Sequence, residues 1–317
     1  SQEFSPQVFA AIGVLAARLR KEPVDLLHGH TRVGQVAAAR LSRALRRPYV
    51  ATWHGFFTPN LGRRLWPCTG QVTIAISEPV RQHLVRVFRV PSARIRMIPH
   101  GVDPTPFESP VEPSERQRLR DHLGLSAEGP VVGTVARLVP SKGVDHLIRA
   151  LRHVRALVPK VRLLLVGDGI ARPELERLTR AEGVADVVRF AGALPETRTV
   201  LSLMDVFVFL PEEEEGFGLS LLEAMASACP IVAVNRGGGA TWVLEESGVG
   251  TKVASGDDTA LAAAIADYLR YPQLARRAGE HARMVAKIRY PLARMVDQVE
   301  AVYRELVPVT SHLPPRP

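Results

Sequence analysis

Two acidic residues with seven residues between them enclose a glycine-rich turn. Glu215 precedes residues 216–218 (Gly-Phe-Gly), and Glu223 follows in a helix that we expect to begin at Leu219. A carboxylate at the carboxyl end of a strand can accept hydrogen bonds from sugar hydroxyls. A helix that starts just after glycines offers unpaired N–H groups and a positive dipole end to an anion. The spacing therefore indicates a ligand with hydroxyls and phosphate, whereas residues 212–214, also acidic, are expected to be a solvated charge run.

A loop with two basic residues forms the second candidate site. Arg137 and Lys142 lie five positions apart, between an expected strand at residues 131–137 and an expected amphipathic helix at residues 144–157. Such a strand–loop–helix unit brings two cations and a helix N-terminus to one point, where a diphosphate would bind. Solvated Arg and Lys are common on protein surfaces, so the loop is specific only in combination with the acidic pair. Together the two motifs predict a diphosphate site.

Histidines follow the expected strands in the first third of the chain. His28 and His30 end one strand, and His54 ends the next. Ligands of open parallel sheets bind beyond the carboxyl ends of the strands, so these side chains are candidates for a ligand site. A histidine at a strand end is nevertheless more often a structural group. A metal site would need an acid or a cysteine at ligand spacing, which this segment lacks, so we predict no metal site.

The elements that must position these residues alternate along the whole chain. Apolar strand-like runs alternate with helical patterns, which is typical of α/β architecture with parallel sheets. The expected strands are residues 24–30, 49–54, 73–77, 95–101, 131–137, 161–169, 187–192, 206–210, 231–235 and 250–253. The expected helices include residues 33–46, 78–89, 116–123, 144–157 and 292–306, together with the one from Leu219. These elements place the candidate residues at the carboxyl ends of parallel strands.

A proline-rich segment at residues 104–115 separates two series of strands. It contains four prolines and no periodicity, so we interpret it as a linker between domains. At 317 residues the chain is long enough for two domains. We predict an N-terminal domain at residues 1–107 and a C-terminal domain at residues 108–290. Residues 291–317 are expected to form a helix that packs back on the first domain, followed by a tail.

The net charge of +9 comes entirely from the first 110 residues, which hold 15 Lys and Arg against 6 Asp and Glu. No nucleic-acid motif accompanies this charge, so we do not predict nucleic-acid binding. Attraction to an anionic membrane surface or to a phosphorylated acceptor fits the charge, as does a set of solvated arginine-rich helix faces. No apolar run approaches the roughly 20 residues that span a bilayer. Only two cysteines occur, so we expect a cytoplasmic protein, with the inner face of the cytoplasmic membrane as its second location.

Residues 215–226 (EGFGLSLLEAMA) resemble the E-x7-E signature of the retaining glycosyltransferases of family 4. Arg137 and Lys142 match the R-x4-K phosphate clamp of that family, and residues 98–103 (IPHGVD) resemble its IPNGVD segment. The resemblance implies the GT-B fold, an α/β fold in which two Rossmann-like domains with parallel sheets face a central cleft. The family's opening strand and glycine-rich loop have no counterpart here. We therefore expect an N-terminally truncated chain whose first domain is incomplete.

The resemblance also assigns roles to individual residues. Arg137 and Lys142 would stabilise negative charge on the departing diphosphate, and Glu215 would bind hydroxyls of the donor sugar. Residues 50–55 (VATWHG) resemble the stretch whose histidine contacts that sugar, so His54 would reach it from the opposite domain and catalysis would need a closed cleft. Glu223 would hold the ribose hydroxyls. The remaining expected donor-binding residues are Gly167, Ala193 and Leu194, the last two at the nucleobase, and Gly216, Phe217, Gly218 and Leu219.

The implied activity is transfer of a sugar, with retention of configuration, from a nucleotide-diphosphate sugar such as a UDP- or GDP-sugar. The acceptor would be a hydroxyl of a glycan, a lipid or a cell-envelope precursor. The chain has no Asp-x-Asp pair, which metal-dependent transferases use to bind Mg²⁺ or Mn²⁺, so we predict neither a cofactor nor a metal. Two alternatives stay open: a truncated donor-binding protein without catalytic activity, and a sugar-nucleotide 2-epimerase on the same fold.

Overall fold

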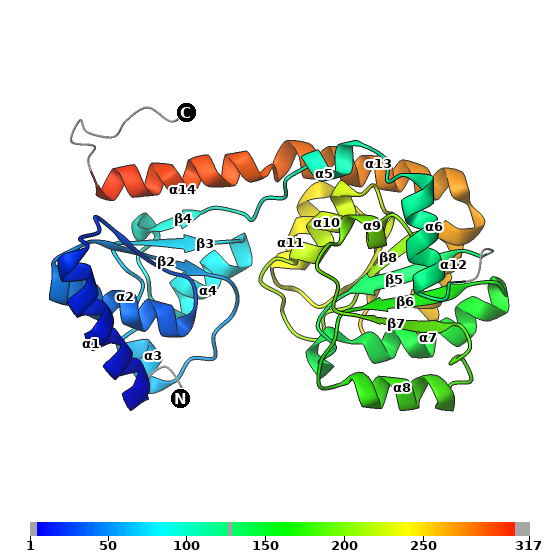
Figure 1. The fold of residues 1–317 in the computed structure, drawn as a ribbon, viewed down its shortest axis with the longest axis horizontal. Helices are drawn as coiled ribbons and strands as arrows, with labels where there is room; N and C mark the ends of the chain where they lie inside the picture. Colours follow the sequence, from blue (N-terminus) through cyan, green and yellow to red (C-terminus); the bar gives the residue numbers. More distant parts are fainter. Residues whose placement is uncertain (1–4, 126–128, 308–317) are drawn as a thin grey trace. The chain divides into compact units, whose positions relative to one another are not determined.

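The chain folds into two compact units, seen in a computed structural model that describes residues 5–125 and 129–307 (Figure 1). Unit 1 comprises residues up to 100 together with those from 293 onward. Unit 2 comprises residues 101–292. Unit 1 is therefore built from two separate stretches of the sequence, whereas unit 2 is continuous.

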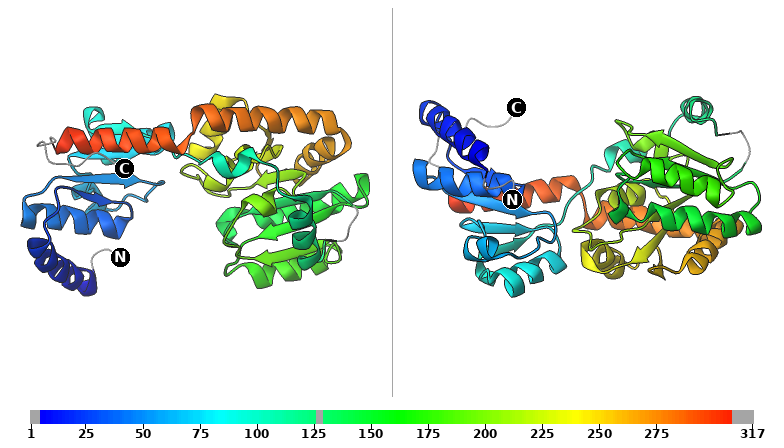
Figure 2. Two further views of the ribbon diagram at one scale, coloured as in Figure 1. Left: turned by 45° about the horizontal axis from the view of Figure 1, so that its top comes forward. Right: turned by 90° about the horizontal axis from the view of Figure 1, so that it is seen from below.

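Unit 1 is built on a four-stranded parallel sheet in the order β1-β2-β3-β4 (Figures 1 and 2). The strands are β1 (Leu27–Gly29), β2 (Tyr49–Trp53), β3 (Val72–Ala75) and β4 (Ile95–Met97). The helices are α1 (Pro6–Lys21), α2 (Arg32–Leu45), α3 (Leu61–Leu65), α4 (Glu78–Phe88) and α14 (Leu292–Leu306). The register pairs His28 with Val50 and Trp53 with Ala75, so the carboxyl ends of the strands share one edge.

Helix α14 completes the core of unit 1. Its residue Val302 is buried with Val50 and Ile74 of the sheet and with Ile98, which follows β4. The partly buried residues packed around this cluster are Leu26, Met295, Val299, Tyr303 and Leu306. Those of α14 recur at intervals of three or four residues and form one apolar stripe, which is why the helix lies against the sheet.

Unit 2 contains a six-stranded parallel sheet in the order β10-β9-β8-β5-β6-β7 (Figure 1). The strands are β5 (Val131–Val135), β6 (Arg162–Val166), β7 (Val188–Gly192), β8 (Val206–Phe209), β9 (Ile231–Asn235) and β10 (Thr251–Ala254). The helices are α5 (Thr105–Glu108), α6 (Pro113–His122), α7 (Val144–Leu157), α8 (Arg172–Ala181), α9 (Arg198–Leu201), α10 (Leu219–Ala226), α11 (Gly238–Ser247), α12 (Asp258–Arg270) and α13 (Pro272–Arg289). From β5 the chain builds the sheet first toward β7 and then, from β8, in the other direction. Ligands of open α/β sheets bind at such a switch point, here between β5 and β8.

The main core of unit 2 lies between the sheet and helices α7, α8 and α12. Val132, Leu165 and Val208 of the strands are fully buried, and Leu147 and Leu151 of α7 pack against them. Strands β5, β6 and β8 bury nearly every residue, as parallel strands covered on both faces do. This rigid sheet sets the positions of the loops at its carboxyl edge.

The segment between the two series of strands is more ordered than the sequence predicts. Within residues 104–115, α5 forms and α6 begins at Pro113. The sequence prediction named a linker here without these helices, and prolines lie in the first turns of both. In a first turn the missing N–H of proline has no helical partner to lose, so proline is tolerated there.

The division between the units also differs from the predicted boundary at residue 107, since it falls after His100. Val102 N–H donates to the carbonyl of Tyr290 at 2.9 Å, and Leu292 N–H donates to the carbonyl of Val102 at 3.0 Å. These bonds tie the segment after His100 to the end of α13 in unit 2. Strand β1 is likewise shorter than the predicted residues 24–30, because its pairing with β2 begins only at Leu27.

Candidate functional site

Three helix starts meet at the carboxyl edge of the sheet in unit 2. Strands β5, β8 and β9 are neighbours, and each leads through a loop into a helix, respectively α7, α10 and α11. Each helix follows a glycine with positive φ: 59° at Gly143, 90° at Gly218 and 77° at Gly237. No side chain of the described residues caps these first turns. Helix N-termini without a side-chain cap attract anions.

Gly218 makes the turn between β8 and α10 possible. A Cβ atom at this position would lie 2.9 Å from Cζ of Phe209, in addition to the strain of its φ. The neighbouring Phe217 points into the core, where it is 2% exposed and contacts the ring of Tyr290 edge-on. Phe217, predicted to bind the donor, can therefore offer a ligand only its backbone. Leu219, the first residue of α10, is by contrast 54% exposed.

Glu215 joins the basic loop to the glycine-rich turn. Lys142 Nζ donates a hydrogen bond to the carboxylate of Glu215, and the two side chains are 21% and 28% exposed. The carbonyl oxygen of Glu215 accepts a hydrogen bond of 2.7 Å from Gly239 N–H in the first turn of α11. Glu215 thus connects the loops that follow β5, β8 and β9. A phosphate oxygen at this place would compete with the Glu215 carboxylate for Lys142.

Arg137 lies two residues after the end of β5 and is exposed. Within the described part of the chain its guanidinium has no hydrogen bond or ion pair. Its backbone is nevertheless fixed, because the next residue, Leu138, donates its N–H to the carbonyl of Asp168 at 3.0 Å. A guanidinium without a partner, on a loop held in place, is suited to bind an anion.

Glu223 lies beside the loop that follows β7. Burial raises the pKa of Glu223 above its ordinary value, a hydrogen bond from Thr197 opposes this change, and the nearby charge of Glu196 adds to it. Thr197 and Glu196 belong to the loop that also contains Ala193 and Leu194, the residues expected to meet a nucleobase. The structure therefore brings the second acid of the E-x7-E motif next to that loop.

Backbone hydrogen bonds hold these loops together along one edge. Gly167 N–H, after β6, donates to the carbonyl of Gly192 at the end of β7 at 2.8 Å. Glu212 N–H, after β8, donates to the carbonyl of Ser141, after β5, at 3.0 Å. All the residues of unit 2 that the sequence singled out lie on these loops or in the first two turns of α10. The edge therefore combines two cations, two carboxylates and helix N-termini.

Glu212 is not part of a solvated charge run, which corrects the sequence prediction. Its side chain is 21% exposed, forms an ion pair with Arg236, which follows β9, and lies 3.4 Å from Nε2 of His146 in α7. The reason is that the loop after β8 folds across the ends of the neighbouring strands. Glu213 and Glu214 are exposed, as predicted.

Four histidines gather at the carboxyl edge of the sheet in unit 1. His28 lies in β1 and His30 directly follows it, His54 follows β2, and His100 lies three residues after β4. His54 is hydrogen-bonded through both ring nitrogens, at 3.2 Å from Nε2 to His30 Nδ1 and at 3.2 Å from Nδ1 to His100 Nε2. We call His30, His54 and His100 the imidazole row. Its members follow three different strands, and the parallel register places the ends of these strands at the same edge of the sheet.

The surroundings of His28, His54 and His100 favour the neutral form of these three rings. Burial, then the charges of His30 and His54, lowers the pKa of His28 from 6.5 to about 4. Burial, then His54 and His30, lowers the pKa of His100 from 6.5 to about 4. Loss of hydration at its ring and then the charge of His30 also lower the pKa of His54, although part of that residue is exposed. A neutral imidazole has one donor and one acceptor nitrogen, which suits a continuous row of N–H···N bonds.

We expect unit 1 to lose about 2 kcal/mol of stability as the pH falls from about 6.5 to about 5.5. The folded pKa values of His28 and His100 are about 4, below the unfolded value of 6.5. Over this range the unfolded chain therefore binds more protons than the folded chain. The stabilisation that comes from the neutral rings of His28 and His100 is complete above pH 6.5 and is lost as the pH falls toward 4. Urea unfolding followed by ¹⁹F NMR of fluorotryptophan resolves Trp53 and Trp66 of unit 1 from Trp242 of unit 2.

The control for this pH dependence is the double variant His28→Gln, His100→Asn. It removes both titrating rings and should flatten the pH dependence of the unfolding free energy measured through Trp53. A double variant that keeps the wild-type dependence would show that other groups cause it.

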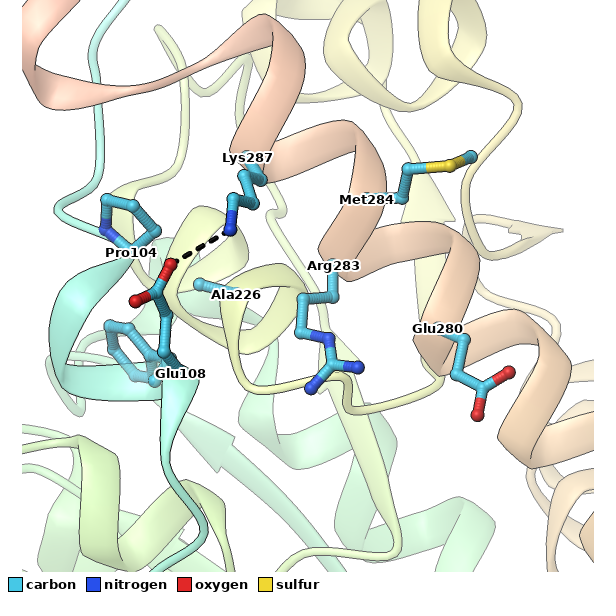
Figure 3. A pocket seen from close by; sticks show the side chains of 8 residues that line it. Pro104, Glu108, Ala226, Glu280, Arg283, Met284 and Lys287 are labelled. Carbon is cyan, nitrogen blue, oxygen red and sulfur yellow. Dashed lines mark hydrogen bonds and ion pairs between the residues drawn. The ribbon is translucent and has the colours of Figure 1, made fainter.

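A cavity of about 560 Å³ lies elsewhere in unit 2, between α5 and α13 (Figure 3). Phe107, Arg283 and Met284 contribute to its lining, and Glu108 forms an ion pair of 2.9 Å with Lys287 at its side. Its lining contains none of the residues predicted from the motifs. The cavity is therefore separate from the site at the carboxyl edge of the sheet.

Among residues 5–125 and 129–307, no three His, Cys, Asp or Glu side chains are grouped so as to hold a metal ion. In the imidazole row the reason is geometric, since His54 turns opposite ring nitrogens to its two neighbours and the three rings do not converge. In the same part of the chain, no helix is both long and apolar enough to cross a bilayer.

Sequence reasoning missed the side chains that hold the predicted residues in place. Thr197 bonds to Glu223, and Tyr303 of α14 bonds to Nδ1 of His28 at 2.6 Å. Tyr303 lies 275 residues from His28, and no motif indicates that contact. For His100 a signal existed, because it replaces the asparagine of the segment that residues 98–103 resemble.

Comparisons with known proteins cover both units. The model of the family described as "Glycosyl transferases group 1" matches residues 115–285, and that of "Glycosyltransferase Family 4" matches residues 1–105. A GDP-mannose-dependent alpha-(1-6)-phosphatidylinositol monomannoside mannosyltransferase of Mycolicibacterium smegmatis is 36% identical over 255 residues. The match covers 75% of this chain and 65% of that relative, so the chain spans less than two thirds of its length.

Solved structures share the fold of this chain. A glycosyltransferase of Rickettsia africae matches with a TM-score of 0.85 and 19% identity, over 97% of this chain and 83% of that one. The Anabaena protein HepE, in complex with UDP-glucose, matches with a TM-score of 0.83 and 25% identity, over 93% of this chain and 82% of that one.

Proposed function

Because the chain belongs to the group 1 glycosyltransferases and has the two parallel-sheet units of their GT-B fold, we propose that it transfers a sugar from a nucleotide-diphosphate sugar to a hydroxyl group. One observation supports the proposal: Lys142 is bonded to Glu215 just before the turn into α10, and Arg137 follows β5, the neighbour of β8 at the switch point of the sheet. Cleavage of the anomeric bond leaves negative charge on the departing diphosphate. Fixed cations and N–H dipoles stabilise charge that develops beside them, and this is often the largest catalytic effect.

The proposed donor is a UDP- or GDP-sugar. The Anabaena protein was solved with UDP-glucose, and the mycobacterial relative is named for its use of GDP-mannose. Both molecules contain the diphosphate that Arg137 and Lys142 would bind. The backbone of Ala193 and Leu194 would meet the base, next to Glu223.

The two carboxylates would bind hydroxyl groups on either side of the diphosphate. Glu223 would accept hydrogen bonds from the ribose, and Glu215 would accept them from the donor sugar. For Glu215 this requires that Lys142 exchanges its carboxylate partner for a phosphate oxygen. The resemblance of residues 50–55 adds His54 of unit 1 to the residues that would serve the donor sugar, either directly or by positioning a neighbouring side chain.

We also propose that the anomeric configuration is retained and that no metal ion is needed. Arg137 and Lys142 would supply the positive charge that a divalent cation supplies in transferases with an Asp-x-Asp pair. The proposed acceptor is a glycan, a lipid or a cell-envelope precursor at the cytoplasmic face of the membrane. The positive charge of the first 110 residues would attract an anionic membrane or a phosphorylated acceptor.

The test is a panel of UDP- and GDP-sugars, each with and without hydroxyl acceptors, in the presence of EDTA. We expect turnover of at least one donor under these conditions, and an α-linked product from an α-linked donor by NMR. Binding of a donor without any turnover would instead favour a donor-binding protein. Failure of both UDP and GDP to bind in calorimetry would contradict the diphosphate site itself.

Glu223→Gln is expected to weaken binding of UDP or GDP by about 10- to 100-fold, because the variant loses the charged acceptor for two hydroxyl groups. Isothermal titration calorimetry at neutral pH measures the dissociation constant. Glu280→Gln on α13 removes an acid of the separate cavity and should leave binding unchanged. An unaltered dissociation constant in Glu223→Gln would remove Glu223 from the site.

A further inference from the structure

His54 is already engaged inside unit 1. Its two ring nitrogens, the only polar atoms of its side chain, bond to His30 and His100 at 3.2 Å each. A side-chain hydrogen bond from His54 to a substrate would therefore break a bond of the imidazole row. The sequence resemblance points to this region, but the hydrogen bonding directs attention to a neighbour of His54.

His30 is the member of the imidazole row that has a ring nitrogen without a hydrogen-bond partner in the described part of the chain. Its Nδ1 bonds to His54, while its Nε2 has no partner within the described part of the chain. The side chain of His30 is exposed, whereas His100 is largely buried and makes a further contact. His28 is bonded at both nitrogens, to the hydroxyls of Tyr303 and Thr52.

We propose that His30, through Nε2, hydrogen-bonds a hydroxyl group of the bound substrate, and that His54 and His100 are positioning residues that fix its ring. This inference deepens the proposed function and rests on it. The hydroxyl belongs to the donor sugar or to the acceptor, because both present the same chemistry to an imidazole. The ring of His28, with its centroid 4.0 Å from that of His30, supports His30 from the other side.

The row sets what His30 offers to the substrate. When His100 Nε2 donates to His54 and His54 Nε2 donates to His30, the proton of His30 lies on Nε2 and is available to an oxygen. When both bonds run in the opposite direction, Nε2 of His30 carries a lone pair and accepts a hydrogen bond from a hydroxyl. A hydroxyl group both donates and accepts, so it matches both states of the row.

Asparagine and glutamine at position 30 separate the two ring nitrogens. The amide of Asn takes the place of Nδ1 and preserves the bond to His54, whereas the amide of Gln takes the place of Nε2 and preserves the contact to substrate. We expect His30→Asn to lower kcat/KM by about 10-fold and His30→Gln to lower it by less than about 3-fold. Because His30 is exposed, both variants should fold, which circular dichroism checks.

The source of the hydroxyl follows from which KM changes in His30→Asn, that of the donor or that of the acceptor. Equal losses in the two variants, or a larger loss in His30→Gln, would mean that His30 acts only within the row and would overturn the inference.

NMR of protein labelled with ¹⁵N in the histidine rings tests the row without turnover. We expect both nitrogens of His54 to be hydrogen-bonded and Nε2 of His30 to exchange with solvent. A spectrum in which Nε2 of His54 is open to solvent overturns the inference, whether or not the chain turns over a nucleotide sugar. Absence of turnover on the full panel contradicts the proposed function, so the two failures are distinguishable.

Discussion

Replacing Lys142 by alanine is expected to lower kcat for sugar transfer by about 10²-fold or more. Lys142 is one of the two cations at the switch point of the unit 2 sheet, and it lies next to the start of α7. The variant loses a charge that interacts more strongly with the departing diphosphate than with the bound donor. Steady-state kinetics with the donor identified from the panel measures the effect.

Lys287→Ala is the matched control for this experiment. Lys287 is also an ion-paired lysine of unit 2, bonded to Glu108 at 2.9 Å, but it lies on α13 at the separate cavity. Its removal should leave kcat unchanged. If Lys142→Ala turned over donor as fast as Lys287→Ala, Lys142 would have no role in stabilising the leaving group.

Gly167→Ala is expected to destabilise unit 2 by about 3 kcal/mol or more. Gly167 has a φ of 125°, which residues other than glycine rarely adopt. A Cβ atom at this position would lie 1.9 Å from the carbonyl oxygen of Ala136. The clash is with backbone, so it cannot be relieved by a side-chain rotation. The loop that would have to move is the one that carries Arg137, so the KM for the donor should also rise. Urea unfolding followed through fluorinated Trp242 measures the stability of unit 2.

Gly183→Ala separates the steric effect from the conformational one. Gly183 also has a positive φ, 67°, but a Cβ atom there would meet nothing within 4 Å. We expect this variant to lose only about 1 kcal/mol. Equal losses of unfolding free energy in Gly167→Ala and Gly183→Ala would show that the contact between position 167 and Ala136 does not limit the packing of the loops that follow β5 and β6.

The elements with the clearest patterns were predicted with their observed bounds. The helices at residues 144–157 and 292–306 and the strand at residues 231–235 match α7, α14 and β9. In the two helices an apolar stripe recurs at helical spacing, and the strand is apolar and short, so tertiary contacts reinforce the local preference. At residues 104–115 the prolines misled the prediction, because proline ends a helix only in its interior and is favourable in its first turn.

The parts of the site that each lie within a single short segment of the chain were predictable. The glycine-rich turn at residues 216–218 and the basic loop were found from spacing, and the structure places both at one sheet edge. The ion pair between Lys142 and Glu215 was not foreseen, because it joins loops 73 residues apart. The imidazole row was missed for the same reason, since its bonds depend on the register of three strand ends.

The position of α14 in unit 1 bears on how the chain matures during synthesis. Val50, Ile74 and Ile98 lack their covering helix until residues 292–306 have left the ribosome. Residues 101–292, which are contiguous, complete their own core before that point. We therefore expect the first hundred residues to remain incompletely folded and to bind chaperones while residues 101–292 are already folded.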